Sequence, residues 1–200
     1  MYALAVNGSP RKKGNTEILL NAVLKPLADA GWTTELVQIG DKGIRGCMAC
    51  GKCSERRDGK CINTADVFNT VMEQMIRADA IILGSPTYFS DVTAEMKALI
   101  DRAGFTAMAG GCLFAGKIGA AVVAVRRGGA VHVFNTMNHL FLISQMIIPG
   151  STYWNMGYGL DRGDVQKDDE ALMNMAHLGR AVDWLGKATA PHKAAYPVQK

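Results

Sequence analysis

Short apolar runs alternate with longer amphipathic segments along almost the whole chain. The apolar or β-rich runs, typical of strands, cover residues 2–6, 33–39, 78–83, 117–125 and 146–148. Between them, apolar residues recur every three or four positions, which predicts helices beginning near residues 15, 67, 92, 131 and 168. Five alternations of strand and helix imply a parallel sheet with helices on both faces. We therefore predict an α/β fold: a three-layer, doubly wound sheet of five parallel strands.

One connection is too long to be a plain connector. Residues 40–63 are rich in glycine and charge, lack periodicity and contain four cysteines. We expect an irregular surface loop here, with its cysteine-rich part at 46–62. The length of 200 residues and the hydrophobic content of 48% suit one well-buried domain. We assign residues 1–190 to this domain and residues 191–200 to a loose C-terminal tail.

Residues 8–16 connect the first predicted strand to the first predicted helix, and their composition suits an anion. The helix N-terminus contributes unpaired backbone N–H groups and the positive end of the helix dipole. Three consecutive cations at 11–13 and side-chain donors such as Ser9 and Thr16 add to this. The glycine spacing matches neither a Walker loop nor a dinucleotide-binding loop. The segment predicts a site for one terminal phosphate; the alternative is an ordinary connection with solvated lysines.

Two further loops follow the carboxyl ends of predicted strands, where ligands of doubly wound sheets bind. In one of them, Tyr88 and Phe89 follow Pro86, a composition that suits the edge of a flat ring. The other, at 126–129, offers glycine N–H groups and two cations. A flat ring with a single terminal phosphate is flavin mononucleotide, so the three loops together predict an FMN site. Considered alone, Tyr88 and Phe89 would be interpreted as core aromatics.

The charge distribution and the cysteine content restrict the class of protein. The net charge of +4 comes from scattered basic residues, which suits a small anionic ligand better than nucleic acid. No leader with a basic and then an apolar segment precedes the first strand, so we expect a cytoplasmic protein. Polar residues interrupt the most apolar segment, 131–148, which predicts no membrane span. Four cysteines clustered between 47 and 61 indicate metal or redox chemistry in such a compartment.

These motifs are similar to those of a known superfamily. Residues 8–16, 84–89, 96–102 and 163–168 resemble the NADPH-dependent FMN reductases and iron-sulfur flavoproteins, and the likeness covers nearly the whole chain. The resemblance implies a flavodoxin-like fold with strand order 2-1-3-4-5. It also implies FMN as the cofactor, with NAD(P)H as a candidate electron donor.

The resemblance implies which residues contact the flavin. The phosphate would be held by Ser9, Arg11, Gly14, Asn15 and Thr16. The isoalloxazine would be bordered by Pro86, Thr87, Tyr88 and Phe89. The third loop would approach the polar edge of the ring through Arg127, Gly128 and Gly129. Because a flavin itself carries out the chemistry while the protein places it, no catalytic side chain is assigned.

The clustered cysteines are similar to the compact motif of the iron-sulfur flavoproteins, whose four thiolates hold a [4Fe-4S] cluster. The corresponding residues here are Cys47, Cys50, Cys53 and Cys61. Three thiols at two-residue spacing can face one centre and the fourth can close it. Basic residues at 52, 56, 57 and 60 would offset the negative charge of a cluster. The seven-residue gap before the fourth cysteine is long for the motif, and zinc or free, regulatory thiols are the alternatives.

These observations predict a flavoprotein oxidoreductase or electron-transfer protein. Electrons would pass through FMN, with or without a cluster, between NAD(P)H or a reduced carrier and a small-molecule or protein acceptor. The alternative is a flavodoxin-like redox-sensing or zinc-binding module without turnover. The sequence leaves the donor and the acceptor open, because it contains no second nucleotide-binding motif.

The helix predicted after residue 130 is apolar on both sides. One side carries Phe134 and Phe141, and the other carries Met137 and Leu140. A helix on a sheet needs only one apolar stripe, so the surplus predicts contact with another helix. We expect a homodimer or homotetramer with the flavin near the interface. The alternative is that the C-terminal helix covers the surplus within one chain.

Overall fold

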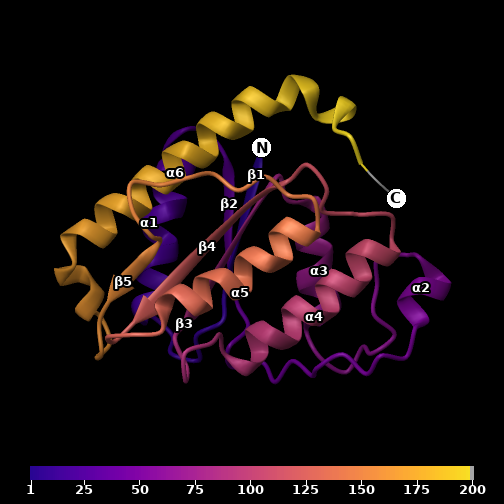
Figure 1. The fold of residues 1–200 in the computed structure, drawn as a ribbon, viewed down its shortest axis with the longest axis horizontal. Helices are drawn as coiled ribbons and strands as arrows, with labels where there is room; N and C mark the ends of the chain where they lie inside the picture. Colours follow the sequence, from indigo (N-terminus) through magenta and orange to yellow (C-terminus); the bar gives the residue numbers. More distant parts are fainter. Residues whose placement is uncertain (199–200) are drawn as a thin grey trace.

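The structure, a computed structural model, describes residues 1–198 and contains a parallel sheet between two layers of helices (Figure 1). Its strands are β1 (Tyr2–Asn7), β2 (Thr33–Gln38), β3 (Ala80–Pro86), β4 (Ile118–Val125) and β5 (Met156–Tyr158). They are arranged in the order β2-β1-β3-β4-β5, and all neighbouring pairs are parallel. The predicted three-layer α/β fold with strand order 2-1-3-4-5 is therefore confirmed.

The central strands are buried because helices cover both of their faces. In β1, Leu4 belongs to the core on one face of the sheet and its neighbour Ala5 to the core on the other. All of β4 is buried as well, which explains its continuous apolar sequence. β3 is longer than the sequence predicts, because residues 84–86 continue to pair with β4.

The helices divide between the two faces of the sheet (Figure 1). One face is covered by α1 (Asn15–Asp29) and α6 (Asp169–Thr189), and the other by α3 (Phe68–Arg77), α4 (Ala94–Ala109) and α5 (Ala130–Ile143). Two 3-10 helices, η1 (Asp164–Lys167) and η2 (Ala190–Ala195), flank α6. The cysteine-rich loop at residues 46–62, called the cysteine loop below, contains a short helix, α2 (Lys52–Arg56). Its length is too small for a periodic pattern, so the sequence does not predict it.

The fifth strand lies later in the chain than the sequence predicts. Residues 146–148 do not form a strand, and Ile147 makes only an isolated bridge to Ile118. The proline and glycine at 149–150 interrupt the pairing. The chain returns to β4 at Asn155, whose carbonyl accepts a hydrogen bond from the Val123 N–H. β5 therefore pairs with the carboxyl half of β4, and the loop that follows it reaches the carboxyl edge of the sheet.

The C-terminal region is more ordered than predicted. The 3-10 helix η2 continues α6, and the Tyr196 hydroxyl donates a hydrogen bond to the Gln145 carbonyl (2.8 Å). The tail is therefore packed up to this position, and residues 199–200 lie outside the described residues. α6 packs on α1, across the sheet from α5 (Figure 1). The alternative that the C-terminal helix covers α5 is therefore wrong.

Candidate functional site

The loops that follow β1, β3, β4 and β5 meet at the carboxyl edge of the sheet, as the parallel topology requires. Together they border a cavity of about 240 Å³. It is lined by Ser9, Arg11, Asn15, Thr16, Pro86, Thr87, Tyr88, Ala124, Arg126, Gly159 and Leu160. The first seven of these residues were predicted to bind FMN, so the structure brings the predicted phosphate and ring residues to one cavity.

The phosphate loop (residues 8–16) leaves the N-terminus of α1 open to a ligand. Ser9 and Thr16 are buried, and the Ser9 hydroxyl accepts a hydrogen bond from the Arg11 N–H (3.2 Å). Gly14 precedes α1, and no side chain within residues 1–198 caps the helix. Its first-turn N–H groups are thus available to an anion. A Cβ at Gly14 would lie 2.9 Å from the Arg11 carbonyl oxygen, so the turn requires glycine.

Two residues of the phosphate loop hold the loop after β5. The Asn15 side chain donates a hydrogen bond to the Asp161 carbonyl (2.9 Å) and accepts one from the Gly163 N–H (2.9 Å). The Arg11 guanidinium donates to the Leu160 carbonyl (3.0 Å). Asn15 therefore positions one wall of the cavity. The sequence does not predict this wall, because its pattern places the fifth strand at 146–148 and the loop near 160 then follows no strand.

The ring loop (residues 84–90) presents a polar atom without a partner. Thr87 lines the cavity, and its Oγ1 atom is buried with no hydrogen-bond partner in the described part of the chain. Buried polar atoms rarely stay unpaired in proteins, so this hydroxyl fits a ligand with a hydrogen-bonding group. Tyr88 is 46% exposed and offers its ring to the same cavity. Both features suit a flat ligand with polar edges.

Phe89 extends into solvent instead of the cavity. Its side chain is fully exposed, and both Phe89 and Ser90 have left-handed backbone conformations, with φ of +48° and +65°. Such conformations are unfavourable for residues other than glycine and occur often at functional sites. The interpretation of Tyr88 and Phe89 as core aromatics is wrong, since both are exposed. The contact of Phe89 with the isoalloxazine stays a prediction.

The loop after β4 contributes a cation to the cavity, but a different one from that predicted. Arg126 lines the cavity, whereas Arg127, Gly128 and Gly129 do not. Gly129 has φ of +87°, and a Cβ there would lie 2.7 Å from the Ser90 hydroxyl oxygen. Glycine therefore allows this loop to pack closely against the ring loop. The predicted contacts of residues 127–129 with the flavin stay predictions.

The four clustered cysteines surround a second cavity, of about 180 Å³. Its lining includes Cys47, Cys50, Cys53 and Cys61, and α4 forms one wall. Two of the thiols are exposed, two are partly buried, and within residues 1–198 none of the four forms a disulfide. Among the same residues, no three Cys, His, Asp or Glu side chains are grouped so that they could hold one metal ion. The structure brings the four thiols to one cavity without closing them on a single point.

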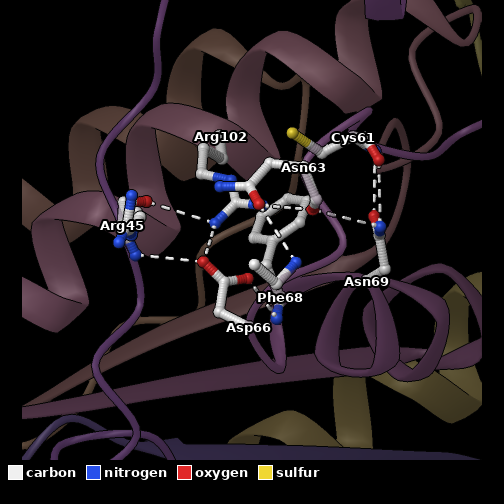
Figure 2. Close-up of polar contacts among 8 residues, drawn as sticks. Arg45, Cys61, Asn63, Asp66, Phe68, Asn69 and Arg102 are labelled. Atoms are coloured by element: carbon white, nitrogen blue, oxygen red, sulfur yellow. Dashed lines mark hydrogen bonds and ion pairs between the residues drawn. The ribbon is translucent and has the colours of Figure 1, made fainter.

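Two basic residues of the cysteine loop are paired with neighbouring carboxylates. Lys52 pairs with Glu55 (2.7 Å), and Arg56 pairs with Asp58. Of the described lysines and arginines, Arg102 alone lines the cysteine cavity. It is buried and belongs to a polar network at the base of the loop (Figure 2). In the sequence this residue belongs to a family motif but has no predicted role, because no local pattern shows that α4 lies beside the cysteines.

Residues 1–161 match the family described as NADPH-dependent FMN reductase. The chain belongs to this family. It is 36% identical over 189 residues to an iron-sulfur flavoprotein of Methanocaldococcus jannaschii, covering 91% of this chain and 95% of that protein. It is 32% identical over 202 residues to an iron-sulfur flavoprotein of Archaeoglobus fulgidus, covering 94% of this chain and 97% of that protein. The resemblance seen in the sequence is therefore confirmed.

Solved structures share the fold of this FMN reductase family member. An NAD(P)H:quinone oxidoreductase from Methanothermobacter marburgensis has a TM-score of 0.62 at 17% identity, covering 90% of this chain and 98% of that one. The Trp repressor binding protein from Bacillus subtilis has a TM-score of 0.65 at 16% identity, covering 88% and 96%. A flavodoxin from the domain Archaea has a TM-score of 0.54 at 17% identity, covering 90% and 99%. The fold is flavodoxin-like, and the family makes the chain an oxidoreductase.

Proposed function

We propose that this oxidoreductase passes electrons through FMN, between NAD(P)H or a reduced carrier and a small-molecule or protein acceptor. The observation that carries the proposal is the cavity at the carboxyl edge of the sheet. Within residues 1–198, it joins a helix N-terminus that has no side-chain cap to a loop in which the buried Thr87 hydroxyl has no hydrogen-bond partner. FMN has a terminal phosphate for the first and a flat, polar-edged ring for the second. The bound flavin supplies the hydride or one-electron chemistry.

In this proposal the phosphate end and the ring end have separate tasks. Ser9, Thr16 and the first-turn N–H groups of α1 bind the phosphate, and Arg11 adds a charge-assisted hydrogen bond. Asn15 fixes the loop after β5 so that the cavity keeps its shape. Residues 86–88 border the ring, with the Thr87 hydroxyl as a hydrogen-bonding partner.

The remaining predicted flavin residues lie next to this cavity. Gly129 packs against Ser90 of the ring loop. We propose that the backbone N–H groups of residues 127–129 approach the polar edge of the ring. Phe89 would cover the exposed side of the ring after a change of side-chain rotamer or by contact with a second copy. Arg126 adds a positive charge to the same region.

Reconstitution tests the flavin proposal. Apo-protein mixed with FMN should form a yellow complex of one flavin per chain, and FMN should bind more tightly than FAD because the phosphate site suits a terminal phosphate. The flavin absorbance should fall on anaerobic addition of NADPH, NADH or a reduced carrier, and return on addition of an acceptor. A colourless protein that cannot take up FMN would instead support a redox-sensing or zinc-binding module without turnover.

We also propose that the cysteine cavity holds a [4Fe-4S] cluster. Four thiols distributed around one cavity suit a centre in which each thiolate binds a separate iron. A zinc ion would instead draw four sulfurs to within about 3.8 Å of one another, given tetrahedral Zn–S bonds of about 2.3 Å. The names of two relatives, both iron-sulfur flavoproteins, support the cluster. Zinc or regulatory thiols are the outcomes that metal analysis would reveal instead.

The proposal extends to the cellular location, the domain organisation and the partners of the protein. None of the helices in residues 1–198 has the length and hydropathy needed to span a membrane. We propose a cytoplasmic location, because the exposed thiols of Cys47 and Cys50 need a reducing compartment to stay available for a cluster. We treat residues 1–190 as one domain and expect no nucleic-acid partner, because the basic residues form no continuous stripe in the sequence.

An apolar groove between α4 and α5 supports assembly into a homo-oligomer. Its rim includes Phe105 and Met108 of α4 and Ile143 of α5, each at least half exposed. We propose that a second copy of the chain covers this groove through a twofold contact. Phe105 also lines the cysteine cavity, so the second copy would approach the metal site. The assembly would be a homodimer, or a homotetramer built from two such pairs.

A further inference from the structure

Arg102 is a buried arginine in the wall of the cysteine cavity. It lies on α4, and its side chain is 1% exposed. A charge taken out of water must be paired and hydrogen-bonded, or the fold is destabilised. The partners of its guanidinium therefore indicate its task (Figure 2).

Two guanidinium nitrogens hold the two ends of the cysteine loop. Nη1 donates a hydrogen bond to the carbonyl of Arg45, which stands two residues before Cys47 (3.2 Å). Nη2 donates to the carbonyl of Asn63, which stands two residues after Cys61 (3.0 Å). Both contacts are visible in Figure 2. Because the guanidinium is planar and rigid, it fixes the distance between the start and the end of the segment that carries all four thiols.

Asp66 and Phe68 keep this guanidinium in place. Asp66 is 4% exposed and pairs with Nη1 at 2.6 Å, and it also accepts the Arg45 N–H (3.0 Å). Burial opposes ionisation of the Asp66 carboxyl, but the hydrogen bonds from Arg102 and from the Arg45 and Phe68 N–H groups, with the charge of Arg102, together outweigh it and lower the pKa. The guanidinium lies over the Phe68 ring, 4.0 Å from its centroid. The side chain is thus held on two sides before any ligand enters the cavity.

Asn69 of α3 provides a second grip on the end of the loop. Its side chain accepts a hydrogen bond from the Cys61 N–H (2.8 Å) and donates one to the Cys61 carbonyl (2.9 Å; Figure 2). The fourth cysteine therefore has a backbone position fixed by the helix layer, independently of any metal.

One nitrogen of the guanidinium, Nε, makes none of these hydrogen bonds. The Nε–H of Arg102 is buried and has no hydrogen-bond partner within residues 1–198. Leaving such a donor unpaired is costly, and the residue that carries it lines the cysteine cavity. A thiolate-bound anionic centre in this cavity would supply the missing acceptor. The basic residues at 52 and 56, by contrast, are already paired with carboxylates.

We infer that Arg102 is a positioning residue of the cysteine cavity: it holds both ends of the cysteine loop and donates its Nε–H to the bound cluster. The inference rests on the proposed function, in which the cavity holds a [4Fe-4S] centre. Hydrogen bonds to cluster sulfur stabilise the more negative, reduced state. Arg102 should therefore raise the reduction potential as well as preorganise the loop.

The test compares three variants of the full chain after anaerobic reconstitution with FMN, iron and sulfide. Arg102→Lys keeps the charge but removes the fork and its Nε–H. Asp66→Asn retains the donor but removes the carboxylate that neutralises it. Arg180→Lys makes the same exchange at an exposed position of α6 and serves as the control. Wild-type FMN affinity shows that each variant has kept its fold.

The cluster potential, measured by a redox titration followed by electron paramagnetic resonance, is the decisive readout. Arg102→Lys should increase the ratio of oxidised to reduced cluster about tenfold at a given potential. This corresponds to a reduction potential lower by about 59 mV for a one-electron couple. Asp66→Asn should shift it the other way, because the positive charge near the cluster is no longer neutralised. A purely structural role would reduce cluster content in both variants without opposite shifts, and would overturn the donor assignment.

A second measurement needs no cluster. Hydrogen exchange of residues 45–63 in the apo-protein should be at least tenfold faster in Arg102→Lys than in wild type, and unchanged in Arg180→Lys. Equal exchange in all three proteins would overturn the positioning role. If wild-type protein takes up no iron and sulfide, the proposed cluster itself is wrong. If wild type loads and Arg102→Lys keeps the wild-type potential, only the role of Arg102 is wrong.

Discussion

The Arg11 guanidinium lies at the cavity of the phosphate loop and donates to the Leu160 carbonyl. This hydrogen bond uses one nitrogen of the fork, and the others stay available to an anion. Lys12 of the same loop has a different situation, because it is 73% exposed and pairs with Asp41. Neighbouring cations in this loop therefore have separate tasks, which substitutions can distinguish.

Arg11→Ala should weaken FMN binding about tenfold or more. A charge-assisted hydrogen bond contributes about 1.5 to 3 kcal/mol, and the loss of the Leu160 contact adds to the effect. Titration of apo-protein with FMN, followed by flavin fluorescence, measures the change. Lys12→Ala is the matched control and should retain the wild-type dissociation constant. Unchanged affinity in Arg11→Ala would remove Arg11 from the phosphate site.

Lys117 is a buried cation with no role in the cavity. Its ammonium donates to the carbonyls of Ile76 and Ala78 at the end of α3, where the helix dipole favours positive charge. Burial, together with the nearby charge of Lys193, lowers the pKa of Lys117 to about 8. The unfolded chain titrates at this residue near the ordinary lysine value of about 10.4. Between these two pH values the unfolded state binds more protons than the folded state.

The unfolding free energy contributed by Lys117 should therefore rise with pH above about 8. Urea unfolding of apo-protein at pH 7.5 and 9.5, compared with Lys117→Met, isolates this contribution. The difference in unfolding free energy between wild type and the variant should increase by about 2 kcal/mol between these pH values, since each pH unit contributes about 1.4 kcal/mol. The burial of Tyr2, which raises the pKa of its phenol, acts in the opposite sense only above about pH 10 and is common to both proteins. A constant difference between the two proteins would contradict the assignment.

The cysteine loop is irregular in itself and takes its shape from the helices beside it. α4 holds both ends through Arg102, α3 holds Cys61 through Asn69, and the α4 wall closes the cavity. The loop needs no disulfide to bring its thiols to one place. The phosphate loop follows the same principle, since Asn15 ties it to the loop after β5.

Cys50→Ser should lose the cluster and keep the flavin. The serine hydroxyl is a poor ligand for iron, and Cys50 lines only the cysteine cavity. Anaerobically prepared wild type should contain about four iron and four acid-labile sulfide per chain, and the variant far less. Cys112→Ser, outside the cysteine cavity, is the control and should match wild type. Zinc near one per chain, with no iron, would end the electron-transfer role proposed for this loop.

The molecule as a whole has an asymmetry between its two helical layers. α6 extends along α1 on one face, and α4 and α5 lie on the other (Figure 1). Between α4 and α5 lies an apolar groove with exposed side chains. Ile143 on α5 is 65% exposed, and Met173 on α6 has a similar exposure of 66%. Substitutions at these two positions distinguish assembly through the groove, which Ile143 lines, from assembly through any exposed apolar residue.

Light scattering of the FMN-bound protein at micromolar concentration should give a mass of at least two chains. Ile143→Asp should shift the mass toward 21.5 kDa, the value for a single chain, because a charge in an apolar interface must be desolvated. Met173→Asp should leave the oligomer intact. A wild-type mass near 21.5 kDa with intact electron transfer would contradict the proposed assembly.

Much of the molecule follows from the local sequence. The sequence shows apolar runs typical of strands, separated by segments with helical periodicity. This alternation determined the three layers, the parallel sheet and four of the five strands. The composition of the phosphate loop and the ring loop identified seven residues of the cavity. These predictions are correct because local patterns of apolar residues reflect burial, and because the carboxyl ends of parallel strands lie at one edge of the sheet.

Other features depended on contacts between residues distant in the sequence. The fifth strand moved from 146–148 to β5, because pairing with β4 resumes only where Asn155 meets it. The Asn15 contact joins residues 146 positions apart in the sequence. The two Arg102 contacts join residues 39 and 57 positions apart. No periodicity encodes such contacts. The sequence by itself determined the layers and the phosphate and ring loops, whereas only the tertiary structure decided which buried groups hold the two cavities in shape.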